Sequence, residues 1–256
     1  MTVLALLPPA QYQAWQLLFE LQRTVSVPWA LIGGQLVALL AAEHGAALPR
    51  TTQDADVLVD VRAAPGGIET VCAFLAERGL ELEGVTPEGV GHRFSRAADP
   101  GPGQVSVDVL APDGLSERTR TVTVPPARTV AVPSGSALLA ACESVEVTVT
   151  GMAGGQEIGQ VRRPRVLAAL VGKAAATTIA GRVDPERDLQ DAALLLSLLD
   201  VAGPALAGLS RSRRAYLRRL EPLRDPGHPA WRPLDREQTR IGLAALRLLW
   251  NRLESS

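Results

Sequence analysis

The chain has 256 residues, of which 46% are hydrophobic, and its formal net charge at pH 7 is −1. This length is enough to bury a substantial core, in one large domain or two small ones. The near-neutral charge excludes a chain that is basic throughout, although it is compatible with a local basic face. The two cysteines, Cys72 and Cys142, imply no disulfide framework, so we expect a reduced, cytoplasmic protein.

Membrane and export segments are not expected. The N-terminal stretch "MTVLALLPPA" lacks the basic region and the apolar core of a signal peptide. The longest apolar stretch covers residues 29–42 and is interrupted by Gly-Gly and Gln, whereas a membrane span needs about 20 apolar residues. We therefore expect no membrane partner.

The first part of the chain mixes helical and strand patterns. Helical periodicity or helix punctuation is found at 10–24, 34–45, 66–79 and 133–142. Buried or alternating strand patterns are found at 27–33, 54–61, 80–85, 90–95, 104–110, 121–124, 145–150 and 157–161.

From Pro164 onward the pattern is helical only. Helices are predicted from 164 to about 181, at 184–200, at 204–220 and at 235–253. We therefore expect an α+β fold, with a mixed sheet flanked by helices in domain 1–162 and a C-terminal helical domain at 163–256.

Gly33 and Gly34 separate a buried strand pattern from a helix pattern. The backbone N–H groups at such a helix start, together with the helix dipole, favour a phosphate. The same two glycines are also compatible with a tight strand–helix turn that binds no ligand.

Three aspartates stand out on the predicted strands. Asp54 and Asp56 are two residues apart, so a strand would point both to the same side, where they repel each other unless a cation or solvent screens them. Asp108 lies among alternating β-branched residues in "QVSVDVLAP". Carboxylates are ligands that Mg²⁺ prefers, and three of them could hold two ions for phosphoryl transfer. Solvated acids on exposed strand faces are the alternative.

The combination of strand, Gly-Gly, helix, Asp-x-Asp strand and a later single Asp resembles the nucleotidyltransferases of the polymerase-beta superfamily. The resemblance implies that Gly33 and Gly34 hold a nucleoside triphosphate. It also implies that Asp54, Asp56 and Asp108 bind two Mg²⁺ ions and that Asp108 helps to activate an acceptor hydroxyl. The sequence departs from the pattern at Gln35, where many members carry Ser, and in the long spacing from Gly34 to Asp54.

The helical half resembles one group within that superfamily. The segment "LAALVGKAAATTIAGRVDPERDLQDAALLL", with "PRTTQDADVLVD" earlier, is similar to the AbiEii/AbiGii-type toxin nucleotidyltransferases, including the MenT group. Lys173 is the single lysine among 26 basic residues, which agrees with a special role for it. The resemblance implies the following further roles: Lys173 as a catalytic and phosphate-binding residue, Asp188 as a catalytic or structural acid, Asp191 as a supporting acid, and Arg50, Thr52 and Arg187 as nucleotide-binding residues.

The acids of "PERDLQD" also have a simpler explanation, because Glu186, Asp188 and Asp191 would favour the dipole at a helix start. The segment 210–224 is rich in arginine, and we expect possible RNA contacts there, with a solvated helix face as the alternative. The candidate RNA-contacting residues are Arg211, Arg213, Arg214 and Arg218.

The sequence thus predicts a Mg²⁺-dependent nucleotidyltransferase that transfers a nucleoside monophosphate from an NTP to an acceptor. The resemblance implies that the acceptor is the 3′ end of tRNA and that the protein is the toxin of a toxin–antitoxin pair, with a cognate antitoxin as partner. Transfer to an aminoglycoside-type small molecule or to a protein, and nucleotide binding without turnover, are the alternatives.

Overall fold

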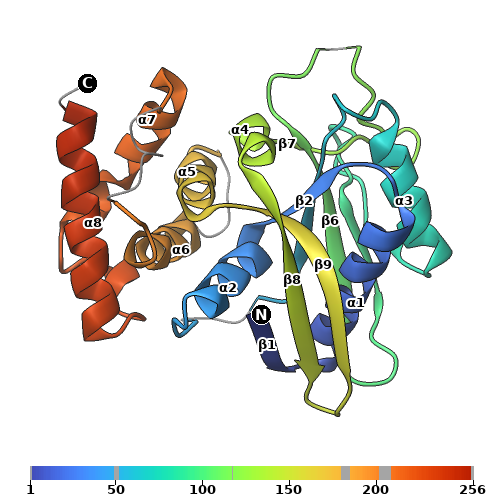
Figure 1. The fold of residues 1–256 in the computed structure, drawn as a ribbon. Helices are drawn as coiled ribbons and strands as arrows, with labels where there is room; N and C mark the ends of the chain where they lie inside the picture. Colours follow the sequence, from blue (N-terminus) through green and yellow to red (C-terminus); the bar gives the residue numbers. More distant parts are fainter. Residues whose placement is uncertain (1, 49–51, 117, 180–184, 202–208, 255–256) are drawn as a thin grey trace. The chain divides into compact units, whose positions relative to one another are not determined.

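The computed structural model describes residues 2–48, 52–116, 118–179, 185–201 and 209–254 (Figure 1). The internal contacts divide the chain into two compact units. One comprises residues 1–39 and 52–164, and the other comprises residues 40–51 and 165–256.

The larger sheet of the first unit is mixed. Its strand order is β2-β3-β6-β5-β4. β7 stands outside this order and pairs with β6. β3 runs parallel to β6, whereas β2–β3, β5–β6 and β4–β5 are antiparallel pairs. The strands are β2 (Trp29–Ile32), β3 (Ala55–Val59), β4 (Glu81–Leu82), β5 (Arg93–Ala97), β6 (Gln104–Pro112) and β7 (Ala131–Val132). Nearly all residues of β2, β3 and β6 are buried, which explains their continuous apolar character.

A second, three-stranded sheet completes the β structure of this unit. β1 (Thr2–Leu7) pairs in parallel with β8 (Cys142–Gly151), and β8 pairs antiparallel with β9 (Gln156–Pro164). The long β8–β9 hairpin packs against α1 (Pro9–Thr24) (Figure 1). Gly159 makes this contact possible, because a Cβ atom there would lie 2.3 Å from the ring of Phe19.

The other helices of this part of the chain follow directly from strands or turns. α2 (Gly33–Glu43) begins at the residue after β2, and α3 (Gly67–Glu77) packs on β6. The short α4 (Gly135–Ala140) precedes β8. The aromatic residues Trp15, Phe19 and Trp29 are fully buried, as are leucines of α1 and α2. Burial of such large apolar side chains is the main favourable term for this unit.

The second unit is helical. It contains α5 (Val166–Ala176), α6 (Pro185–Ser197), α7 (Arg211–Leu217), the 3-10 helices η2 (Arg218–Arg224) and η3 (Pro229–Trp231), and α8 (Arg236–Glu254). α6 packs against both α5 and α8. Leu194, Leu195 and Leu196 on α6 are completely buried, because neighbouring helices cover more than one side of it.

The expected fold class is confirmed: the molecule is α+β, with mixed β structure flanked by helices and a helical C-terminal segment. The expected domain boundaries remain predictions. The expected strand at 121–124 is wrong, because only Val122 forms an isolated bridge there and Pro125-Pro126 follows at once. The expected helix at 204–220 is partly wrong, because α7 begins at Arg211 and continues as a 3-10 helix; residues 204–208 lie outside the described residues.

Two strands, β1 and β7, were not expected from the sequence. β4 is shorter than predicted and β5 begins later than predicted. Within the described residues, no helix combines the length and the apolar character needed to cross a membrane.

Candidate nucleotide-binding site

Strand register brings the predicted acids to one face of the larger sheet. Asp56 of β3 lies directly opposite Asp108 of β6, and Arg93 of β5 lies opposite Asp108 from the other side. Directly paired residues share a face of the sheet. Asp54, just before β3, joins the group through a contact of 3.1 Å between its Oδ2 atom and Nη2 of Arg93. The structure therefore brings together all three predicted acids.

Arg93 is the residue that sequence reasoning missed. Its Nε donates to Oδ1 of Asp108 at 2.8 Å and its Nη2 donates to Oδ2 at 2.9 Å, a bidentate arrangement. The same Nη2 also donates to Asp54. The hydrogen bond and the negative charge of Asp108 are the main causes that raise the pKa of Arg93, against the effect of burial. The guanidinium is therefore a permanent positive charge between the two acids.

The two predicted glycines are explained by close approach of side chains. Gly33 has a φ of +67°, and a Cβ atom on it would lie 1.8 Å from Oδ2 of Asp56. A Cβ atom on Gly34 would lie 2.4 Å from Oγ1 of Thr52. The carboxylate of Asp56 thus lies against the first residue of α2, where the helix dipole favours negative charge.

The expected two-ion metal site remains a prediction. Both carboxylate oxygens of Asp108 already accept hydrogen bonds from Arg93. In the part of the chain that the structure describes, no three or more His, Cys, Asp or Glu side chains form a group suited to hold a metal ion. Asp54 also accepts from Arg93, through its Oδ2 atom.

Gln35, the departure from the family pattern, connects three segments around the site. It is completely buried, and its Oε1 accepts from Nε1 of Trp15 at 3.1 Å and from Nε2 of Gln11 at 3.2 Å. Its Nε2 donates to the backbone oxygen of Thr52 at 3.0 Å. The amide therefore ties the first turn of α2 to α1 and to the segment that leads to Asp54. A serine hydroxyl is too short to replace these three contacts.

Thr52 is itself buried, with its hydroxyl against Gly34. Arg50 lies outside the described residues. Their predicted roles in nucleotide binding remain predictions.

Lys173 belongs to the helical unit and connects two of its helices. Its Nζ atom on α5 lies 2.7 Å from Oδ2 of Asp191 and 3.3 Å from Oδ1 of Asp188, both on α6. The two carboxylates are almost completely buried and the lysine side chain is 12% exposed. A compact ammonium group with three donors suits this place between two carboxylates better than a planar guanidinium does. Arg187, which is on α6, is exposed.

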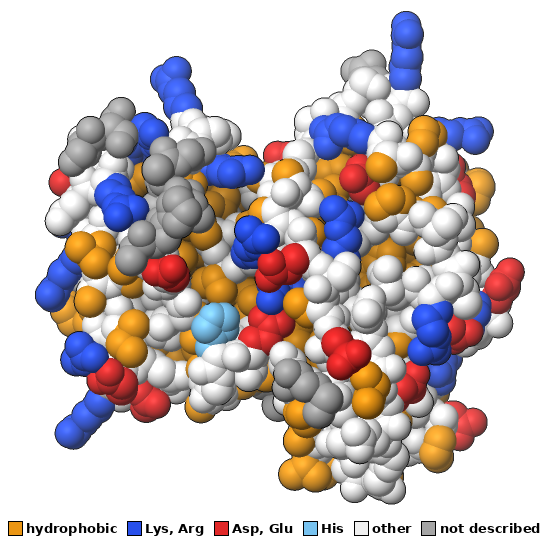
Figure 2. All heavy atoms as spheres, in the orientation of Figure 1, with side chains coloured by type: hydrophobic (Ala, Val, Ile, Leu, Met, Phe, Trp, Pro, Cys, Tyr) orange, Lys and Arg blue, Asp and Glu red, His pale blue; other side chains and the backbone are white. Residues whose placement is uncertain are grey.

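The arginines of the candidate RNA surface differ in what they contact. Arg211 is exposed, and Arg213 and Arg214 are half-buried on α7. Arg218 donates from Nη2 to the backbone oxygen of Leu253 at 3.1 Å, so it caps the last turn of α8. Part of the basic pattern is therefore structural. Basic and acidic side chains both occur over the face of the molecule shown in Figure 2.

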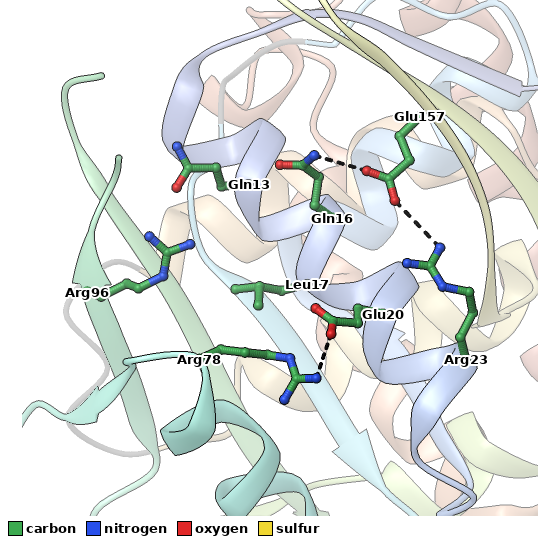
Figure 3. Close-up of a pocket in the computed structure, with 8 residues that line it drawn as sticks. All are labelled: Gln13, Gln16, Leu17, Glu20, Arg23, Arg78, Arg96 and Glu157. Carbon is green, nitrogen blue, oxygen red and sulfur yellow. Dashed lines mark hydrogen bonds and ion pairs between the residues drawn. The ribbon is translucent and has the colours of Figure 1, made fainter. Parts of the chain in front are cut away.

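A pocket of about 420 Å³ lies between α1, β5 and β9 (Figure 3). None of Asp54, Asp56 and Asp108 lines it. Arg96 lines it from β5, on the face opposite to Arg93 because the two positions differ by an odd number. Most of its charges are paired: Arg78 contacts Glu20 at 2.5 Å and Arg23 contacts Glu157 at 3.5 Å. None of the predicted site residues lines this pocket. Its lining residues are Gln13, Gln16, Leu17, Glu20, Arg23, Arg78, Arg96 and Glu157.

Comparisons with known proteins give little further information. No protein-family model and no curated protein matches the chain. Among solved structures, the chain is similar to the antibiotic-resistance factor ANT(2″)-Ia, whose solution structure was described in terms of substrate-regulated conformation dynamics. The TM-score is 0.35 and the sequence identity 14%, over 97% of each chain.

Proposed function

We propose that the protein is a nucleotidyltransferase whose site is the face of the sheet that carries Asp54, Asp56 and Asp108. The observation that carries the proposal is the register of β3, β5 and β6, which gathers these acids beside the first turn of α2. Isolated carboxylates repel each other, so a cluster of three on one face favours a cationic partner. The motif pattern of two glycines, Asp-x-Asp and a later Asp supports the same class.

In the proposed reaction, a hydroxyl of the acceptor attacks the α-phosphorus of an NTP. The bond between the acceptor oxygen and the α-phosphorus forms while the bond between the α-phosphorus and the oxygen bridging to the β-phosphate breaks. Pyrophosphate leaves. The hydroxyl proton passes to a carboxylate of the site or to water. A divalent ion bound by Asp54 and Asp56 would neutralise charge on the phosphates. The backbone of Gly33 and Gly34 and the side chain of Thr52 are the proposed nucleotide contacts of this unit. The motif resemblance alone supports the nucleotide-binding roles of Arg50, Lys173 and Arg187 and the acid role of Asp188.

The proposed acceptor is the 3′ end of tRNA, and the proposed role is that of a toxin held in check by an antitoxin. These finer assignments depend on the motifs of the AbiEii type and on the arginine-rich α7. Binding to the RNA backbone requires accessible cations; Arg211 is exposed, and Arg213 and Arg214 are half-buried.

The test is incubation with each of the four α-labelled NTPs and Mg²⁺, with total tRNA or an aminoglycoside as acceptor. We expect label on tRNA for the wild-type chain and none for Asp54→Asn. Asp60→Asn is the matched control, because Asp60 follows the far end of β3 and its Oδ1 accepts from the N–H of Ala63. We expect Arg213→Ala/Arg214→Ala to weaken transfer to RNA alone. Equal transfer by Asp54→Asn and wild type would contradict the proposed site.

A further inference from the structure

The pocket between α1, β5 and β9 is lined almost entirely by polar side chains (Figure 3). All of its lining residues belong to the first unit, and Leu17 is the one apolar side chain among them. Its volume of about 420 Å³ lies in the range of small-molecule sites. A pocket of this size and lining suits a small, polar ligand.

The charges of the lining leave one cation in excess. Arg78 donates from Nη2 to Oε1 of Glu20 at 2.5 Å, and Nη1 of Arg23 lies 3.5 Å from Oε1 of Glu157. The hydrogen bond from Arg78 lowers the pKa of Glu20, so this carboxylate is ionised at neutral pH. Arg96 lies across the pocket from Arg23 and Glu157 (Figure 3). Among the described residues, Arg96 is the cation of this lining that has no carboxylate partner.

The donors that Arg96 leaves unused are those suited to an oxyanion. Its Nη1 donates to the backbone oxygen of Ala97 at 3.0 Å, and this is its hydrogen bond within the described part of the chain. Its Nε is buried and has no acceptor there. Nε and Nη2 form the edge by which Arg93, on the other face of β5, holds both oxygens of Asp108. A small rotation of the Arg96 guanidinium would offer the same edge to an anion in the pocket.

The neighbouring arginine is held firmly in place. The guanidinium of Arg78 lies 3.6 Å from the centre of the Phe74 ring, and its Nη1 donates to the backbone oxygen of Phe74 at 3.0 Å. Its Nε is a second buried donor without an acceptor among the described residues. Buried donors that lack acceptors cost free energy, so a ligand that supplies one gains affinity. A wall fixed in this way also lowers the ordering cost of binding.

We propose that this pocket binds a small polar molecule through one oxyanion group, a carboxylate or a phosphate, held by the Nε–Nη2 edge of Arg96. The carboxylates of Glu20 and Glu157 disfavour ligands with several negative charges and can accept hydrogen bonds from hydroxyl or amino groups of the ligand. None of the residues given a role in nucleotidyl transfer lines the pocket, so this proposal does not depend on the proposed function.

The test is nuclear magnetic resonance of the full-length chain, titrated with inorganic phosphate or with acetate at an ionic strength held constant with chloride. The Nε–H resonance of Arg96 is assigned by its absence in Arg96→Gln, and the backbone amides of Leu17 and Ala97 report binding in every variant. We expect saturable shifts at these positions with phosphate, with acetate or with both. Phosphate alone would identify a phosphate-bearing ligand, and acetate alone a carboxylate.

We expect Arg96→Gln to weaken binding by about tenfold or more, because a charged hydrogen-bond partner is lost. The matched control is Arg128→Gln, which removes the same charge from an exposed position of the first unit outside the pocket and should bind like the wild type. Arg96→Lys keeps the charge without the planar fork, and we expect weaker binding for it too. The dispersion of the amide spectrum checks that each variant is folded.

Three results would overturn the inference. Shifts in the wild type that stay linear, or that chloride reproduces, would mean ionic screening or an adventitious ion only. Unchanged binding by folded Arg96→Gln would place the anion elsewhere. Unchanged binding by Arg96→Lys would contradict the role of the Nε–Nη2 edge. Each of these results leaves the proposed nucleotidyl transfer untouched, because that reaction is assigned to other residues.

Discussion

At the scale of single residues, the site depends on close approaches that only particular side chains allow. Asp56 fits against Gly33 because no Cβ atom is present, and the completely buried side chain of Gln35 makes three hydrogen bonds. Arg93 gives two of the acids a shared cationic partner. Each of these contacts leads to a measurable expectation.

The Gly33→Ala variant should be clearly destabilised. A φ of +67° costs a non-glycine residue about 1–2 kcal/mol, and the contact with Asp56 adds about 1–3 kcal/mol of overpacking. Gly45→Ala is the control: Gly45 has a similar φ of +65° but nothing within 4 Å of the added atom. Urea denaturation should therefore give a larger loss of unfolding free energy for Gly33→Ala. Equal losses would mean that the approach of Asp56 is unimportant.

Replacement of the buried amide in Gln35→Leu should lower the free energy of unfolding by about 2 kcal/mol or more, because the donors of Gln11 and Trp15 lose their acceptor. Gln22→Leu changes an exposed residue of α1 in the same way, and we expect a change within about 0.5 kcal/mol. Thermal or urea denaturation followed by circular dichroism measures both. Similar stability of the two variants would contradict the role given to Gln35.

Both cysteines should be unreactive in the folded protein. Burial raises the pKa of the Cys72 thiol to about 12, with a smaller contribution from Glu69, and burial raises that of Cys142 to about 11. Since the thiolate is the reactive form, labelling at pH 8 should be slow until the chain unfolds. The unfolded thiols ionise at lower pH than the folded ones, so stability should fall as pH rises above about 9. Rapid labelling of native protein by a thiol reagent would contradict this.

At the scale of secondary-structure elements, strand register and ion pairs determine which side chains meet, and this could not be predicted from the sequence alone. The helix and strand patterns around Trp15, Trp29 and Asp56 were predictable, because long periodic or continuous apolar segments specify element type. The partner of Asp108 was not predictable, because "VGHRFS" gives no sign of which strand it joins. β1 was missed for a related reason: a terminal strand depends on pairing with β8, more than 130 residues away.

The Lys173 contact makes a prediction about the α5–α6 pair. Lys173→Met leaves Asp188 and Asp191 buried without this cation, and removal of one partner from a buried ionic group costs about 3–5 kcal/mol. The combined variant Lys173→Met/Asp188→Leu/Asp191→Leu should recover most of this loss, because no charge remains to be buried. Melting temperatures of the two variants test this. If the single variant melts like the wild type, Lys173 has no structural role.

At the scale of the whole molecule, the chain combines an α+β unit that carries the acids with a helical unit that carries Lys173 and the arginine-rich α7. The fold class and the gathering of Asp54, Asp56 and Asp108 on one face could be predicted from motif order. The involvement of Arg93 in that face could not, since it arises from the pairing of β5 with β6. The division of α2 between two units also leaves no trace in the sequence pattern.

The most direct test of the central claim, that the acidic face performs nucleotidyl transfer, is a comparison of α-labelled and γ-labelled NTP with wild-type protein, Mg²⁺ and total tRNA. Nucleotidyl transfer places the α-label on the acceptor and releases the γ-label as pyrophosphate. We expect α-label on tRNA with the wild type and with Asp60→Asn, and none with Asp56→Asn. Transfer of γ-label, or undiminished α-label transfer by Asp56→Asn, would contradict the account.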